Sequence, residues 1–221
     1  MASLTARALL LDMDGTLVNS EAVVNRVWRE WAEEMGLDPG RVLAVMPGRQ
    51  GHATMAEVLP DRPMELNHAD NARMLAKEIA DLDGIVPVPG APAFLAAVAS
   101  VPHALVTSAD APLTKARMAA AGLPLPDVRV TAESVSASKP DPEGFLKGAA
   151  ELGVSPADCV AFEDSPAGIA AARAAGMRVI GIGPRAVAQS PTAWADTLHQ
   201  VRAEPLPDGS VHLTVRARAC V

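Results

Sequence analysis

The chain has 221 residues, of which 49% are hydrophobic and 20% charged, an ordinary globular composition that excludes a disordered protein. Its 26 acidic residues outnumber its 19 lysines and arginines, and no basic run interleaves with aromatic residues, so we expect no nucleic-acid partner. The two cysteines, Cys159 and Cys220, are too few for a disulfide framework or a zinc site. The longest apolar run near the start, residues 8–11, is too short for a signal peptide or a membrane span, so we predict a cytoplasmic protein without membrane contact.

The first predicted strand is this apolar run at residues 8–11. Four similar runs follow later in the chain, at residues 104–106, 128–130, 160–162 and 179–182. Because Arg129 is the only polar residue in these runs, they are typical of parallel strands that are buried on both faces of a sheet. Helical segments lie between the later strands, and this alternation predicts a doubly wound, Rossmann-like α/β fold.

Residues 17–88 break the alternation, because they follow the first strand without a second one. They carry three helical patterns, at residues 21–35, from Asp38-Pro39 onward and at residues 66–79. We therefore predict an inserted α-helical cap domain at residues 17–88, on a catalytic core domain made of residues 1–16 and 89–221.

Capping and turn residues mark the ends of several core elements. Asp141 and Ser165 each precede a proline, which is the pattern of a helix N-cap followed by proline at the first helical position. Residues 207–209, Pro-Asp-Gly, separate two strand-like segments at 201–206 and 211–215. This arrangement predicts a C-terminal β-hairpin.

Polar residues with chemical potential follow the predicted strands. Asp12 and Asp14 come directly after the first strand, where two carboxylates repel each other unless a cation or a proton lies between them. Thr107 and Ser108 follow the second strand, and their hydroxyl and backbone N–H groups can hold phosphate oxygens, although such residues are also ordinary turn formers. Lys139 lies in a loop before a helix and suits a phosphoryl group as a point charge, with a solvent-exposed lysine as the simpler alternative.

Glu163 and Asp164 follow the strand at residues 160–162, immediately before a helix. Acidic residues in this position can serve merely to complement the helix dipole. Ser165 already supplies the cap, however, so these carboxylates are available for another task. Because ligands of open parallel sheets bind beyond the carboxyl ends of the strands, we expect them to join Asp12 and Asp14 as oxygen ligands for Mg²⁺.

Together these motifs resemble those of a known family. They comprise Asp12-Met13-Asp14-Gly15-Thr16, Thr107-Ser108, Lys139-Pro140 and Glu163-Asp164-Ser165-Pro166-Ala167-Gly168. The set is similar to the four motifs of the haloacid dehalogenase superfamily, and the last motif and the helical insert resemble its β-phosphoglucomutase-like branch. Within that branch the likeness extends over nearly the whole chain, and it is greatest to bacterial phosphatases that act on hexose or hexitol phosphates.

The resemblance implies a Mg²⁺-dependent phosphatase that acts on a small phosphorylated sugar or polyol. Asp12 would be the nucleophile that forms an aspartyl-phosphate, and Asp14 would be the general acid and base. The metal would be held by an Asp12 carboxylate oxygen, the Asp14 backbone carbonyl and Asp164, with Glu163 as a further ligand or a neighbour of the site. Charge on the phosphoryl oxygens would be stabilised by Thr107, the Ser108 backbone and Lys139.

The predicted cap carries the candidate specificity residues. The loop at residues 46–51 matches the position of the family's specificity loop, and its Arg49 and Gln50 are candidates to donate hydrogen bonds to sugar hydroxyls or phosphate. A solvent-exposed arginine beside a glycine turn is the alternative for Arg49. Residues 16–19 and 87–90 are expected hinges for cap closure, and we expect a monomer or a weak dimer.

Other activities fit the sequence less well. A dehalogenase uses only the first aspartate, and a phosphonate-cleaving relative needs a cap lysine that Lys77 does not match in position. A phosphosugar mutase shares every core motif but needs a second phosphate site in the cap, where the loop offers Arg49 alone. A non-catalytic binding module would be expected to lose motif residues, and here all are present. We therefore favour hydrolysis, with the mutase as the alternative.

Overall fold

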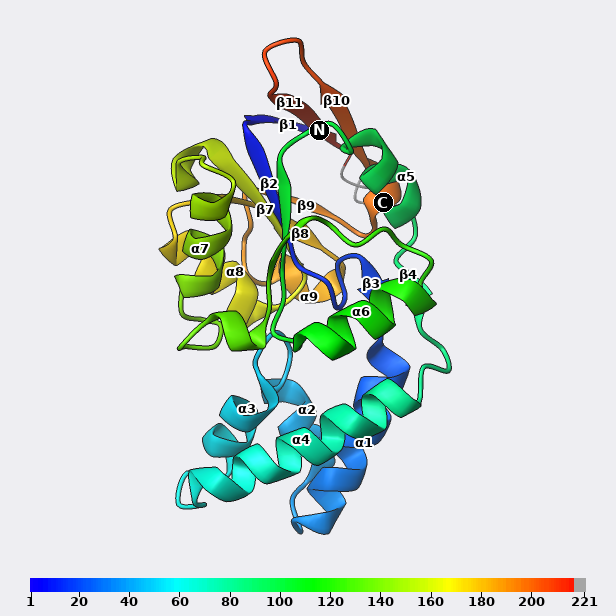
Figure 1. Ribbon diagram of the computed structural model, residues 1–221, viewed down its shortest axis with the longest axis vertical. Coiled ribbons are helices and arrows are strands. Elements are labelled where there is room, and N and C mark those ends of the chain that lie inside the picture. Colours follow the sequence, from blue (N-terminus) through cyan, green and yellow to red (C-terminus); the bar gives the residue numbers. More distant parts are fainter. Residues whose placement is uncertain (217–221) are drawn as a thin grey trace.

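A parallel sheet of six strands lies at the centre of the structure, a computed structural model that describes residues 1–216 (Figure 1). The strands, in spatial order, are β6 (Val128–Val130), β5 (His103–Val106), β2 (Ala8–Leu11), β7 (Cys159–Glu163), β8 (Arg178–Ile182) and β9 (Ala193–Ala195). All neighbouring pairs are parallel, which confirms the predicted α/β fold and the five predicted strands. The edge strand β9 is not among the predicted strands. Cys220 lies outside the described residues.

Helices cover both faces of this sheet. They are α5 (Ala91–Ala97) and α6 (Ala111–Ala120) on one face, and α7 (Glu143–Glu151) and α8 (Pro166–Ala174) on the other. Leu9 of β2 shares a core cluster with Phe94 of α5, whereas the next residue, Leu10, shares a second cluster with Phe145 of α7. Successive strand residues point to opposite faces, so each strand contributes to both cores, as the doubly wound prediction requires.

Four helices between β2 and β5 form a separate unit, residues 21–80, here called the helical lobe. They are α1 (Glu21–Glu34), α2 (Pro39–Val45), α3 (Gly51–Val58) and α4 (Met64–Ala80). The lobe has its own core, which includes Trp31 of α1 and Met55 of α3. The short α3 is not among the predicted helices, because it begins inside the segment predicted as a loop. Within residues 1–216, every helix is too short or too polar to cross a bilayer.

Two extended segments connect the helical lobe to the rest of the described chain, residues 1–20 and 81–216, here called the α/β lobe. The segments are β3 (Val18–Asn19) and β4 (Val86–Pro87), which pair with each other in antiparallel fashion. They overlap the segments predicted as hinges. Figure 1 shows the two lobes stacked along the long axis of the molecule, with the helical lobe at one end.

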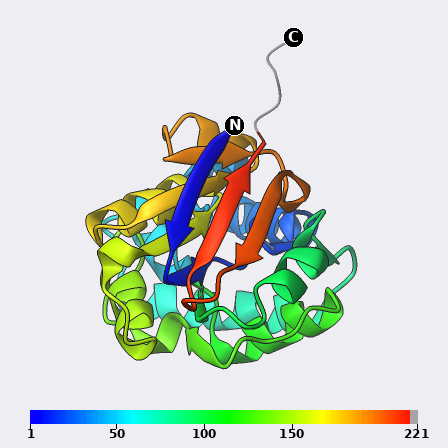
Figure 2. The ribbon, with the colours of Figure 1, turned by 90° about the horizontal axis from the view of Figure 1, so that it is seen from above.

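A second, antiparallel sheet lies at the end of the molecule opposite the helical lobe (Figures 1 and 2). β10 (Val201–Pro205) and β11 (Val211–Val215) form the predicted C-terminal hairpin, and β1 (Ala2–Ala6) pairs with β11. β1 is not among the predicted strands, although exposed Ser3 and Thr5 alternate with the more buried Ala2, Leu4 and Ala6, the pattern of a strand that is buried on one face. Leu213 of β11 is buried in the same cluster as Leu9, so this sheet closes the α/β lobe.

The two predicted N-caps have different outcomes. Ser165 caps α8 as predicted, because its side chain accepts a hydrogen bond from the first turn of the helix. The prediction for Asp141 is wrong by one residue, since α7 begins at Glu143 and Pro142 occupies the cap position. The Asp141 backbone N–H donates to the Ser138 carbonyl at 3.0 Å, and its Oδ1 accepts from the Glu143 backbone at 2.9 Å. These bonds hold Asp141 in a turn that ends before the helix starts.

Candidate active site

A cavity of about 460 Å³ opens between the two lobes at the carboxyl edge of the six-stranded sheet. The α/β lobe lines it with Asp12, Asp14, Thr107, Ser108 and Asp164, among others. The helical lobe contributes residues of α1, α4 and the loop before α3, including Trp28, Arg49, Asn71, Met74 and Glu78. The strand-end residues meet here because the carboxyl ends of parallel strands share one edge of a sheet.

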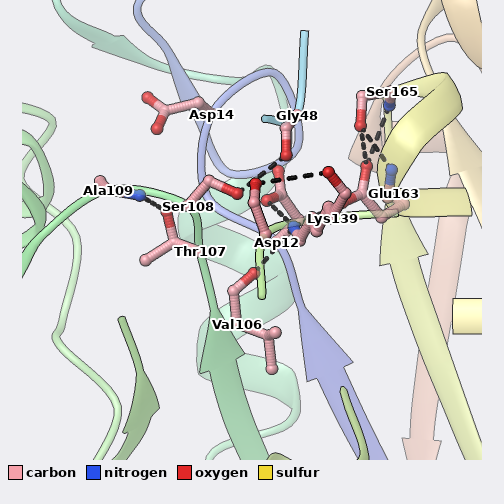
Figure 3. A network of polar contacts seen from close by, with 12 residues as sticks. Asp12, Asp14, Gly48, Val106, Thr107, Ser108, Ala109, Lys139, Glu163 and Ser165 are labelled. Atoms are coloured by element: carbon pink, nitrogen blue, oxygen red, sulfur yellow. Dashed lines mark hydrogen bonds and ion pairs between the residues drawn. The ribbon is translucent and has the colours of Figure 1, made fainter. Parts of the chain in front are cut away.

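A buried lysine joins two carboxylates at this edge (Figure 3). Lys139 Nζ donates to Asp12 Oδ1 at 2.7 Å, to Glu163 Oε1 at 2.6 Å and to the Val106 carbonyl at 3.1 Å. An ammonium has three N–H donors, so Lys139 is fully satisfied. Asp12, Lys139 and Glu163, here called the Lys139 cluster, are all buried, which excludes the alternative of a solvent-exposed lysine.

Burial and like charge govern the protonation of this region. Burial, and after it the charge of Glu163, raises the pKa of Asp12 well above its usual range, although Lys139 opposes the shift. Burial alone would lower the pKa of Lys139, but the charges of Asp12 and Glu163 raise it above the ordinary value. Burial and Glu163 also raise the pKa of Asp164 to about 7, while Arg185 lowers it. The three carboxylates therefore have too little positive charge nearby, and a further cation would stabilise them.

The donor atoms at this edge fit a divalent cation. Carboxylate oxygens of Asp12, Glu163 and Asp164 lie within 4.8 Å of one another. Asp12 Oδ2 is buried and accepts no hydrogen bond from any part of the chain that the structure describes. A buried carboxylate oxygen without a partner is costly, and such oxygens are the ligands that Mg²⁺ prefers. The residues present therefore fit Mg²⁺.

Glu163 supports its neighbours with both carboxylate oxygens. Its Oε1 binds Lys139, and its Oε2 accepts hydrogen bonds from the backbone N–H and the hydroxyl of Ser165, both at 2.9 Å. A Cβ atom at Gly168 would lie 1.6 Å from Oε1. The glycine that ends the fourth motif thus leaves the space that this carboxylate occupies. The sequence left open whether Glu163 is a metal ligand or a neighbour of the site, and these contacts give it a supporting role in either case.

Asp164 is held by an arginine that the sequence analysis does not single out. Arg185 of α9 (Pro184–Val187) donates to Asp164 Oδ2 at 2.8 Å and reaches Glu21 of the helical lobe at 3.4 Å. Arg185 follows β8, so it lies at the same carboxyl edge as the other site residues. Its place just after a parallel strand is the signal in the sequence that marks it as a candidate functional residue.

Thr107 and Ser108 line the cavity just beyond β5. Thr107 Oγ1 accepts a hydrogen bond from the Ala109 backbone at 3.1 Å, which fixes its side chain in the turn. Ser108 Oγ donates to the carbonyl of Gly48, in the loop before α3, at 2.8 Å (Figure 3). The Ser108 hydroxyl therefore binds the helical lobe, and its backbone N–H is the group still predicted to meet phosphate.

Asp14 belongs to a different network, although it is only two residues from Asp12. Its carboxylate points away from the Lys139 cluster (Figure 3). Oδ1 accepts from the Ser20 hydroxyl at 2.6 Å, and Oδ2 lies 2.9 Å from Arg117 Nη1. Arg117 Nη2 donates to Glu78 Oε2 of α4 at 2.6 Å. Asp14, Arg117 and Glu78 are here called the Arg117 bridge.

The Arg117 bridge could not be read from the sequence. Arg117 lies within α6 and Glu78 within α4, where charged residues are ordinary, and only the packing of the two lobes brings them to Asp14. The Asp14 side chain also lies outside the carboxylate group that could hold a metal. The metal ligand that the family resemblance implies is its backbone carbonyl, and that assignment stays a prediction.

The two candidate residues of the loop at residues 46–51 lie in different surroundings. Arg49 lines the cavity, and its Nη1 lies 3.6 Å from Glu57 Oε2. Gln50 is buried outside the cavity lining: its backbone N–H donates to the Ser138 hydroxyl at 2.9 Å, and its side-chain amide to the Ala132 carbonyl at 3.1 Å. Gln50 thus fastens the helical lobe to the α/β lobe, and contact with substrate stays a prediction for both residues.

Comparisons with known proteins agree with the geometry. A family model for haloacid dehalogenase-like hydrolases matches residues 6–176. Hexitol phosphatase A of Escherichia coli is 38% identical over 212 residues, which cover 93% of this chain and 97% of that protein. A fructose-1-phosphate phosphatase of the same bacterium is 34% identical, over 79% of this chain and 95% of its own. In fold, the chain resembles the crystal structure of β-phosphoglucomutase from Clostridium difficile, with a TM-score of 0.79 at 21% identity, over 89% of this chain and 93% of that one.

Proposed function

The chain belongs to the haloacid dehalogenase-like hydrolases, and from this premise we propose that it is a phosphatase of small phosphorylated sugars or sugar alcohols. The observation that carries the proposal is the state of Asp12. This buried carboxylate lines the cavity, is held through Oδ1 by Lys139, and has in Oδ2 an oxygen without a hydrogen-bond partner among residues 1–216. The relatives named as hexitol and fructose-1-phosphate phosphatases support the substrate class.

In the first proposed step, the Asp12 carboxylate attacks phosphorus through one of its oxygens, the bond from phosphorus to the sugar oxygen breaks, and an aspartyl-phosphate forms. Asp14 donates a proton to the departing sugar oxygen. Because the attacking and leaving oxygens are roughly in line through phosphorus, this acid belongs on the side of the phosphoryl group away from Asp12. The observed direction of the Asp14 carboxylate, away from Asp12, supports that role (Figure 3).

In the second proposed step, water attacks the phosphorus of the aspartyl-phosphate and Asp14 accepts its proton. Inorganic phosphate leaves, and Asp12 is restored as a carboxylate. Negative charge on the phosphoryl oxygens is stabilised by hydrogen bonds from the Thr107 hydroxyl and the backbone N–H of Ser108. Lys139 contributes its positive charge, since its three N–H donors are already bonded to Asp12, Val106 and Glu163.

We propose Mg²⁺ as the cofactor. Asp12, Asp164 and the Asp14 backbone carbonyl would hold it, with Glu163 beside them. When bound, the ion supplies positive charge that offsets the repulsion between the phosphate and the attacking carboxylate.

We also propose that residues 17–88 act as a cap on a core of residues 1–16 and 89–221. The sugar part of the substrate would then face the helical lobe, where Arg49 lines the cavity. Docking of the lobe excludes water while the leaving oxygen is protonated. A cytoplasmic location and a monomeric or weakly dimeric state remain predictions.

The mutase alternative would need a second phosphate site in the cavity. The arginines of the lining are Arg49, Arg117 and Arg185, and each of them lies beside a carboxylate of this chain. None of these three is an uncompensated cation in the part of the chain described, which favours hydrolysis over bisphosphate binding.

The test is inorganic phosphate release from a panel of hexose, hexitol, pentose and glycerol phosphates, with Mg²⁺ or with EDTA. We expect metal-dependent release that is lost, by about 10⁴-fold or more, in Asp12→Asn. Asp61→Asn, which changes an exposed aspartate of the helical lobe, is the matched control and should behave as wild type. Absence of release across the panel would refute the phosphatase, and an assay for isomerisation of β-glucose 1-phosphate would then test the mutase.

A further inference from the structure

The Arg117 bridge is a buried ionic contact between the two lobes. Arg117 belongs to α6 of the α/β lobe, and Glu78 belongs to α4 of the helical lobe. Both side chains are buried, with exposed fractions of 4% and 8%. Buried charges are kept only where partners satisfy them, so one guanidinium placed between two carboxylates is a specific arrangement rather than a solvated surface pair.

The bridge also fixes the orientation of Asp14. Oδ1 accepts a hydrogen bond from the Ser20 hydroxyl at 2.6 Å, and Oδ2 forms an ion pair with Arg117 Nη1 at 2.9 Å, so each carboxylate oxygen has a separate partner. Two contacts on opposite oxygens leave the carboxylate little freedom to rotate. Arg117 Nη2 donates to Glu78 Oε2 at 2.6 Å, so two separate nitrogens of the guanidinium contact the two acids, while its Nε has no hydrogen-bond partner among residues 1–216.

We propose that Arg117 is a positioning residue that holds Asp14 on the leaving-group side of the cavity, and that Glu78 makes this positioning depend on the docked helical lobe. The inference rests on the proposed function, in which Asp14 gives its proton to the departing oxygen. When the lobes separate, Arg117 loses Glu78 and its fixed orientation, so Asp14 is correctly placed only over an enclosed substrate. Acid catalysis is thereby tied to lobe closure.

A purely structural role and a positioning role predict different dependence on the leaving group. A sugar alkoxide needs a proton to leave, whereas 4-nitrophenolate is a stable anion that leaves without one. The ratio kcat/KM covers the steps up to the first breakage of the phosphorus–oxygen bond, so it does not include hydrolysis of the aspartyl-phosphate. The probes are therefore a hexitol phosphate and 4-nitrophenyl phosphate, each measured with Mg²⁺.

For Arg117→Met, we expect kcat/KM for the hexitol phosphate to fall by about 30-fold or more, and for 4-nitrophenyl phosphate to fall far less. Asp14→Asn sets the upper limit of this selective loss. Glu78→Gln keeps a hydrogen-bond acceptor, so we expect kcat/KM for the hexitol phosphate to fall only severalfold, and kcat/KM for 4-nitrophenyl phosphate to fall less. Arg73→Met is the matched control, since it removes an exposed ion pair with Glu34 in the helical lobe and should change neither ratio.

Arg117→Met leaves Glu78 buried without its cation, and the variant can fail to fold. The double variant Arg117→Met/Glu78→Gln removes the stranded charge, and its thermal unfolding and far-UV circular dichroism check that the fold is intact. It should show the same selective loss. Equal falls for both substrates, or no fall in a folded variant, would overturn the inference.

The Asp14→Asn variant distinguishes a failure of the proposed acid role of Asp14 from a failure of the positioning role of Arg117. If Asp14→Asn itself reduces both substrates equally, the acid role in the proposed function fails. If Asp14→Asn is selective and the folded Arg117 variants are not, the positioning role of Arg117 fails and the phosphatase mechanism stands.

Discussion

Asp12 and Asp14 are two residues apart, yet Asp12 belongs to a network within one lobe and Asp14 to a network that joins both lobes. The Lys139 cluster around Asp12 is built entirely from the α/β lobe and is sealed by buried contacts of 2.6 to 2.7 Å. The Arg117 bridge around Asp14 extends from the α/β lobe to α4 of the helical lobe. The groups that would attack and stabilise phosphorus are therefore fixed in one rigid unit, whereas the group that would protonate the leaving oxygen depends on how two units dock.

The two networks have the same excess of carboxylates over cations, but they differ in whether the carboxylate oxygens are satisfied. In the Lys139 cluster one ammonium serves two carboxylates, Asp164 close by is paired with Arg185, and Asp12 Oδ2 has no hydrogen-bond partner in the described chain, which leaves room for a cation. In the Arg117 bridge one guanidinium serves two carboxylates, and Ser20 supplies the remaining hydrogen bond to Asp14. In the proposed function, phosphate and metal would bind beside the place of the neutral sugar and the transferred proton.

The largest effect is expected from removing the centre of the Lys139 cluster. Lys139→Met leaves Asp12 and Glu163 buried without their shared cation, which should cost about 3–5 kcal/mol of unfolding free energy. It should also lower kcat/KM for a hexitol phosphate by about 10²–10³-fold. Urea unfolding and phosphate release measure the two effects. Lys147→Met removes a lysine of the neighbouring α7 that donates to the Ser134 carbonyl, and it should change neither quantity appreciably. A fully stable, active Lys139→Met would contradict the central place of this lysine.

A smaller effect is expected from filling the space beside Glu163. The Cβ of Gly168→Ala would meet Glu163 Oε1 at 1.6 Å, so the carboxylate must move away from Lys139 and Ser165. We expect a loss of about 3 kcal/mol, measured by urea unfolding. Gly144→Ala, in α7, has its nearest contact at 3.3 Å from a side-chain carbon and serves as the matched helical control. Equal stability of the two variants would be evidence against the close fit around Glu163.

The Arg117 bridge should make stability depend on pH. Burial raises the pKa of Glu78 from the usual 4.5 to about 7, against the lowering effect of Arg117, with Asp14 and Asp110 raising it further. The folded protein therefore keeps the Glu78 proton in a range where the unfolded chain releases it, so the contribution of Glu78 to stability falls as the pH rises through this window. The fall is at most about 3 kcal/mol.

Unfolding free energies of the wild type and Glu78→Gln at pH 5, 6, 7 and 8 isolate this term. The wild type should lose stability relative to the variant between pH 5 and pH 7, and the difference should be level above that range. A difference that does not vary with pH would show that Glu78 is ionised in the fold throughout.

The smallest effect is expected at the loop that docks on the α/β lobe. Gly48 has a φ of +80°, and a Cβ there would lie 2.1 Å from Ser165 Oγ, so Gly48→Ala should disturb docking of the loop. We expect kcat/KM for a hexitol phosphate to fall about tenfold, with little change in Tm. Gly36→Ala has a similar φ of +67° but no neighbour within 4 Å, so it isolates the backbone penalty from the clash. Identical activities of the two variants would exclude a role for this contact in closure.

Local patterns account for what could be predicted. The five predicted strand segments are apolar apart from Arg129, and Asp12, Thr107, Lys139 and Glu163 lie where such segments or their connecting loops end. The elements that were not predicted include the helix α3, which begins inside a predicted loop, and the strands β1 and β9. Arg185 follows a strand, so its position in the sequence indicates a place in the site. The roles of Arg117 and Glu78 could not be predicted, because no motif near them in the sequence indicates that they reach the site.

The sequence by itself determined the α/β fold, the helical insert and the family. It also determined that the candidate site residues lie at the carboxyl edge of the sheet. These follow from hydrophobic periodicity and from motifs whose members are close together or tied to strand ends. Only the tertiary structure decided which charges meet: Lys139 with Asp12 and Glu163, Arg117 with Asp14 and Glu78, and Gln50 with the α/β lobe instead of the cavity. The partner and the burial of a charged side chain depend on which elements pack together, and burial determines how strongly that charge acts.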